Sequence, residues 1–177
     1  MKMLIHIIPV DPTNPPTTSH NLGPPVAALY HYTTVEKLRS IIKSGGIRPS
    51  NARIEPSEKP VVWFSSRPTW EPTATKCPLT GKLGQLVTAS AQGGLARISV
   101  PPDAAPYIFS QLPLVAGTTT ATCIGLLVSG LDLGADPDQW RFSPEPLPVS
   151  LFRKVELFDF DENRWRAIDM AELACRN

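Results

Sequence analysis

The apolar residues of this chain are concentrated in short runs, and polar or proline-rich segments separate each run from the next. Three runs, at 28–32, 61–65 and 95–100, are rich in β-branched and aromatic residues, a composition typical of strands. Prolines stand beside the second and third runs, where a strand would begin or end. The pattern therefore predicts a short strand at each of these three runs.

A helical period follows the first run. Apolar residues recur at positions that share one helical face, namely Val35, Leu38, Ile41 and Ile42. Thr33 and Glu36 have the spacing of a capping box, in which each side chain binds an unpaired amide of the first turn. Two glycines at 45 and 46 favour the end of the helix there. We predict a helix over residues 34–44.

The rest of the chain divides into an irregular segment and a more regular end. Residues 67–94 contain Pro, Thr and Gly throughout, so we expect a long loop with at most a short regular element. Apolar residues between 121 and 131 share a helical face and predict a helix, despite nearby threonines. Further strands are predicted at 140–143, 149–160 and 164–168, the last two forming a hairpin around a turn at 161–163.

Proline narrows the fold class. The chain has 20 prolines in 177 residues, roughly twice the usual share of about 5%. Because an interior proline costs a helix about 3 kcal/mol, a helical bundle is excluded and an α+β fold of short elements is expected. Residues 1–25 are predicted to form a short strand followed by a proline-rich arm, and 26–177 to form a single domain.

Charge and cysteine content limit the candidate partners and compartments. The net charge is +1, so no overall field would attract a polyanion. Three widely separated cysteines fit a reducing cytoplasm better than a disulfide framework, and the three histidines lack metal-ligand spacing. No apolar run approaches the ~18 residues of a membrane span. We expect a soluble cytoplasmic protein with no metal and no membrane partner.

Two segments carry candidate binding chemistry. His31 and Thr33 end the first strand next to a helix N-terminus, where an imidazole and a hydroxyl can bind a ribose or phosphate. Trp63 and Ser65 lie in the second strand, where an aromatic face can stack on a flat ring and a hydroxyl can orient it. Arg97, in the third strand, is a candidate for contact with a phosphate.

The order of these motifs resembles the ADP-ribosyltransferase-like superfamily. The segments "LYHYTT", "IIKSGGIRPS" and "VVWFSS" are similar to the opening of the branch that includes DNA-targeting ADP-ribosyltransferase toxins and tRNA 2′-phosphotransferases. The resemblance implies a fold of two small packed β-sheets with few helices, and NAD+ bound in the cleft between them as a co-substrate. It assigns His31, supported by Thr33, and Ser65, with Trp63 or Phe64 as a stacking wall, to NAD+ binding.

The resemblance also implies a glutamate that orients the nicotinamide ribose, at about position 140. That position is Trp140. A fixed carboxylate matters because the nicotinamide bond breaks through an oxocarbenium-like state that negative charge stabilises. Glu71 and Glu145 are the leading replacements, whereas Glu156 lies in the predicted hairpin, where a structural role is favoured.

Several functions remain open at this point. The first is NAD+-dependent ADP-ribosyl transfer to a protein or nucleic acid, or NAD+ hydrolysis, in a bacterial toxin held by a cognate inhibitor or delivered into a target cell's cytoplasm. RNA 2′-phosphate transfer to NAD+ has weaker support from scattered arginines. The second class is a catalytically silent module that binds NAD+, another nucleotide or a protein. A third is an interaction protein whose proline arm docks on a partner.

Overall fold

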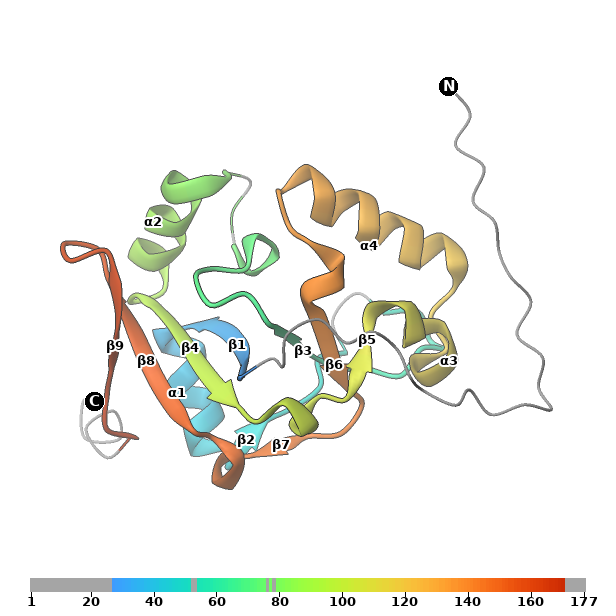
Figure 1. The fold of residues 1–177 in the computed structure, drawn as a ribbon, viewed down its shortest axis with the longest axis horizontal. Coiled ribbons are helices and arrows are strands. Elements are labelled where there is room, and N and C mark those ends of the chain that lie inside the picture. Colours follow the sequence, from blue (N-terminus) through green and yellow to red (C-terminus); the bar gives the residue numbers. More distant parts are fainter. Residues whose placement is uncertain (1–26, 52–53, 76, 78, 171–177) are drawn as a thin grey trace.

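The computed structural model describes residues 27–51, 54–75, 77 and 79–170. The predicted strand at 4–10, the proline-rich arm and Cys175 lie outside these residues. The described residues form a mixed α+β structure built on a seven-stranded antiparallel sheet, with strand order β5-β6-β3-β1-β4-β8-β9 (Figure 1). A two-stranded ribbon, β2-β7, stands beside it. The α+β class is therefore confirmed.

Strands and helices follow one another along the described chain as follows: β1 Leu29–Thr34, α1 Val35–Lys43, β2 Gly46–Ile47, β3 Val62–Ser65, α2 Gly81–Ala91, β4 Leu95–Val100, β5 Tyr107–Ile108, α3 Leu112–Ala116, α4 Thr120–Asp132, β6 Trp140–Ser143, β7 Leu147–Pro148, β8 Lys154–Asp159 and β9 Arg164–Ala167. Short 3-10 turns connect several of them, including η1 at Pro72–Ala74. The expected strands at 28–32, 61–65, 95–100 and 140–143, the two expected helices and the C-terminal hairpin are all present.

The division into sheets differs from the expected pair of similar small sheets. Strand β3 pairs with β1 on one side and with β6 on the other, so strands from both halves of the chain join one large sheet. The ribbon forms where Gly46 meets Pro148, and a Cβ on Gly46 would lie 2.3 Å from the carbonyl oxygen of Leu147. Only glycine allows this close approach.

Three details of the sequence interpretation are wrong. The capping box does not form: Thr33 stays in β1, and Thr34 is the N-cap, whose hydroxyl donates to Gln92 Oε1 at 2.9 Å. The regular structure in residues 67–94 is not limited to a short element, because the helix α2 occupies eleven of them. The strand expected from 149 starts only at Lys154, because a 3-10 turn, Val149–Leu151, precedes it.

The two faces of the sheet bury different residues. On one face, α1 packs Val35 and Leu38 against the aliphatic core of β1, β3 and β4. On the opposite face, Tyr32 of β1 and Leu95 of β4 pack with Trp70, which lies in the loop after β3. In Figure 1 that loop, with η1, lies between α2 and α4. Among the described residues no helix is both long and apolar enough to cross a membrane.

Candidate functional site

A cavity of about 590 Å³ lies between the central strands and α4. Its walls come from β1, β3 and β6, from residues 71–74 of the loop after β3, and from the second half of α4. The volume is within the range of about 300–1,000 Å³ typical of small-molecule sites. Its lining includes aromatic and polar residues, among them Tyr30, His31, Trp63, Ser65, Glu71 and Trp140.

Glu71 is the buried carboxylate of this cavity. Glu71 is only 6% exposed, and it is the N-cap residue of the short turn η1. One oxygen, Oε1, accepts hydrogen bonds from the Thr73 hydroxyl at 3.0 Å and from the Trp140 indole N–H at 3.2 Å. The other oxygen, Oε2, is buried and has no hydrogen-bond partner among the described residues. Because buried polar atoms are nearly always hydrogen-bonded to protein or water, Oε2 is available to accept a hydrogen bond from a bound molecule or a water.

The register of the sheet places three of the cavity residues in one row. Ser65 pairs with Tyr30 of β1 and with Trp140 of β6. Side chains of paired residues stand on the same face, so this row forms a continuous floor. The Ser65 hydroxyl is buried and accepts a hydrogen bond from the Arg67 amide at 3.2 Å, which turns the chain out of β3.

His31 occupies the place where β1 and β3 separate. These strands share one paired position, Tyr30 with Ser65. Beyond it, the His31 imidazole binds the Trp63 carbonyl at 2.9 Å through Nδ1 and packs on Phe64, with ring centroids 5.7 Å apart. A carbonyl can only accept, so Nδ1 carries the proton in this contact. His31 thereby joins the two strands at the cavity wall.

Three predicted site residues lie away from the cavity. Thr33 is buried within β1 opposite Ala96. Glu145 is exposed in the turn after β6, where its backbone bonds Ser143. Arg97 is buried and paired with Glu156 at 2.6 Å, so its charge is already neutralised. Of the two candidate glutamates, the structure brings only Glu71 to His31, Trp63 and Ser65.

The loop that carries Glu71 also forms one wall of a second cavity, of about 400 Å³. Trp70 and Pro72 face this second cavity, whereas Glu71 and Thr73 face the first. Trp70 is held between Tyr32, at 5.2 Å between ring centroids, and Trp165, at 6.2 Å. Burial raises the pKa of Tyr32, an effect that the nearby Arg97 partly offsets. Tyr32 therefore stays protonated and donates a hydrogen bond to the Arg67 carbonyl.

Sequence reasoning missed the roles of two residues. Trp140 stands where the resemblance places a glutamate, and its indole N–H instead holds the carboxylate of Glu71. Arg48, exposed after β2, is the one Lys or Arg among the described residues that line the first cavity. Arg48 is one of the scattered arginines weighed for an RNA phosphate site, but no periodicity showed that β2 would bring it to the cavity.

Comparison of the chain with protein-family models, with curated proteins and with solved structures found no match. Any function must therefore be argued from the cavity residues and from the sequence motifs.

Proposed function

We propose that the first cavity binds NAD+ and that the protein transfers the ADP-ribosyl group to a macromolecular acceptor or to water. The observation that carries this proposal is the buried Glu71 carboxylate, with one unpartnered oxygen, in a cavity that His31 and Ser65 also line. These two residues are the ones that the resemblance to ADP-ribosyltransferase-like proteins assigns to NAD+. The carboxylate supplies the group that the resemblance requires and that position 140 lacks.

The chemistry of the cavity fits this co-substrate. Trp63, 36% exposed, offers an aromatic face to a flat ring such as nicotinamide or adenine. Arg48 offers an exposed guanidinium for the pyrophosphate, with which it can form paired hydrogen bonds. Arg97 is not assigned to the phosphate, because its guanidinium is held by Glu156.

In the proposed reaction the bond between the nicotinamide nitrogen and the ribose carbon breaks, and its electron pair leaves with nicotinamide. The ribose carbon becomes electron-deficient, and the Glu71 carboxylate stabilises the resulting positive charge. An acceptor oxygen or nitrogen then bonds to that carbon and releases its proton to solvent. Trp140 contributes by keeping Glu71 Oε1 in place, which leaves Oε2 to face the ribose hydroxyls.

The experiment is nicotinamide release from NAD+, together with NAD+ binding measured by thermal shift, in Glu71→Gln. This change keeps the size of the side chain and removes its charge. We expect release to fall at least about a hundredfold, comparable with the loss of one preorganised electrostatic group in other enzymes. The matched control is Glu36→Gln, an exposed residue in the first turn of α1, which should leave release unchanged.

Two other outcomes would redirect the proposal. A loss of release in Glu145→Gln, with Glu71→Gln active, would move the catalytic role to Glu145. Binding of NAD+ by the unsubstituted protein with no release to water or to any acceptor would favour the catalytically silent module. If NAD+ neither binds nor is cleaved, the proposal fails.

A further inference from the structure

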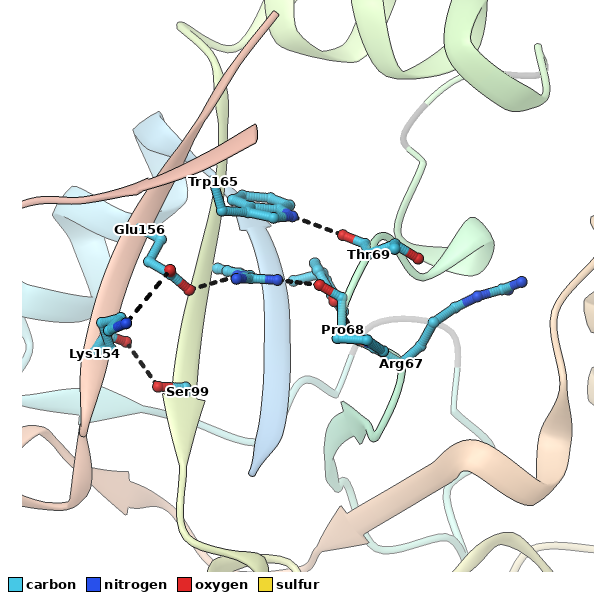
Figure 2. A network of polar contacts seen from close by, with 9 residues as sticks. Arg67, Pro68, Thr69, Ser99, Lys154, Glu156 and Trp165 are labelled. Atoms are coloured by element: carbon cyan, nitrogen blue, oxygen red, sulfur yellow. Dashed lines mark hydrogen bonds and ion pairs between the residues drawn. The ribbon is translucent and has the colours of Figure 1, made fainter. Parts of the chain in front are cut away.

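Three consecutive backbone carbonyls at the start of the Glu71 loop each accept a hydrogen bond from a different side chain. The Tyr32 hydroxyl donates to the Arg67 carbonyl, Arg97 Nη1 to the Pro68 carbonyl, and the Trp165 indole N–H to the Thr69 carbonyl at 2.8 Å. Figure 2 shows Trp165 and Glu156 on the sheet side of this loop segment, with the dashed contacts leading to Thr69 and Pro68. We call Tyr32, Arg97 and Trp165 the carbonyl clamp.

The clamp is built by the register of the sheet. Arg97 of β4 pairs with Tyr32 of β1 on one side and with Glu156 of β8 on the other. Trp165 comes from β9, the next strand along. Three strands that are distant in the sequence thus each contribute one hydrogen-bond donor to the same loop.

Arg97 has little freedom to move. Its Nε binds Glu156 at 2.6 Å, and its guanidinium lies over the rings of Tyr30 and Trp165, 4.6 and 4.5 Å from their centroids. A planar cation held between two rings and fixed by a buried carboxylate keeps one orientation. That orientation directs Nη1 to the Pro68 carbonyl.

After the three clamped carbonyls, the next two side chains, Trp70 and Glu71, point to different sides of the loop. Trp70 is buried on the side of Tyr32 and Trp165, with its indole N–H on Thr75 Oγ1 at 3.2 Å. Glu71, the next residue, lines the first cavity. The backbone of residues 67–69 is fixed by the three hydrogen bonds, and Trp70 is fixed by its packing. The direction in which the next side chain, Glu71, points is therefore fixed as well.

We propose that the carbonyl clamp positions Glu71, so that Tyr32, Arg97 and Trp165 are positioning residues for the cavity although none of the three holds the carboxylate itself. A catalytic effect of this positioning rests on the proposed function, whereas the positioning of Glu71 by the clamp does not. The competing explanation is that Thr73 and Trp140, which bond Glu71 directly, are sufficient to hold it.

The test is the NMR resonance of the Trp140 indole N–H, which donates to Glu71 Oε1 and so reports where the carboxylate lies. The chain has four tryptophans, so four indole resonances can be assigned by single substitutions. Glu71→Ala defines the resonance of the unbonded indole. Tyr32→Phe and Trp165→Phe each remove one clamp donor and keep an aromatic ring in place. Ser99→Ala is the matched control, because it removes a hydrogen bond to the Lys154 carbonyl in the same sheet, away from the loop (Figure 2).

We expect the Trp140 resonance in both clamp variants to move toward its position in Glu71→Ala, and to stay in place in Ser99→Ala. An unmoved resonance in both clamp variants, or an equal movement in Ser99→Ala, would overturn the proposal. Both variants remain folded if their unfolding transitions stay cooperative, which is checked on the same samples. The resonance is read without NAD+, so a failure of the proposed function leaves this test intact. If NAD+ is cleaved, kcat should fall roughly tenfold to a hundredfold with little change in KM, because displaced catalytic groups slow the reaction itself.

Discussion

Gly130 of α4 provides the sharpest test of how the cavity is closed. It is the buried residue of this helix, and a Cβ added to it would lie 2.3 Å from Cη2 and 2.6 Å from Cζ2 of the Trp140 ring. Carbon atoms in contact prefer a separation of about 3.5–4.0 Å. Gly130→Ala must therefore displace either the helix or the Trp140 indole, which holds Glu71.

The size of the effect follows from a comparison within the same helix. Gly125 also lies in α4, and a Cβ there would meet nothing within 4 Å. Both alanine substitutions gain helix propensity, about 1 kcal/mol each. Only Gly130→Ala adds the cost of overpacking, about 1–3 kcal/mol. The free energies of unfolding of the two variants should differ by that cost alone, with Gly125→Ala more stable than the unsubstituted protein.

Urea unfolding followed by far-UV circular dichroism measures both free energies, and the Trp140 indole resonance reports the local displacement. We expect a lower unfolding midpoint in Gly130→Ala than in Gly125→Ala, and a shifted resonance in Gly130→Ala alone. Equal stabilisation of the two variants would refute the close packing of α4 on Trp140. It would also remove the reason for describing α4 as a wall of the cavity.

Two further predictions concern the buried polar network. Arg97→Met leaves the buried Glu156 with only the largely exposed Lys154 as an ion-pair partner, at 4.0 Å. We expect this variant to lower the free energy of unfolding by about 3 kcal/mol, and the added change Glu156→Leu to recover much of the loss. Urea titrations of both variants measure these free energies. The pKa of Tyr32 is raised by burial, so the folded state holds this proton more tightly than the unfolded state. Its contribution to stability is complete below the ordinary tyrosine pKa of about 10 and is lost as the pH rises above it. Tyr32→Phe should therefore show a shallower loss of stability as the pH rises above about 10, and an identical slope would contradict this assignment.

Local patterns were sufficient to predict most of the regular elements. The helical period of Val35 and Leu38 and the β-branched run at 61–65 correspond to α1 and β3, because each element buries one face in a nearby core. Helix α2 was missed because its buried residues are small, Gly84, Thr88 and Ala89, so it presents no strong apolar stripe. Gly84 is required where a Cβ would lie 2.2 Å from the Leu79 carbonyl oxygen, a contact that no local pattern records.

Of the candidate site, the sequence identified residue types and the tertiary structure selected among them. His31, Trp63 and Ser65 are recognisable from the strand motifs "LYHYTT" and "VVWFSS" that contain them. Glu71 and Glu145 could not be separated by sequence, since both lie in turn-rich segments. The pairing of β3 with β6 separates them, because it brings Trp140 to Glu71 and leaves Glu145 in the exposed turn beyond the strand.

The sequence by itself therefore determined the α+β class, the helices α1 and α4, and the presence of polar and aromatic groups in the strands. These features depend on contacts between residues a few positions apart. Only the tertiary structure decided that the strands form one large sheet and that Arg97 clamps a loop instead of facing the cavity. Both depend on strand register, which pairs residues as distant as Arg97 and Glu156 and is set by the packing of the whole sheet.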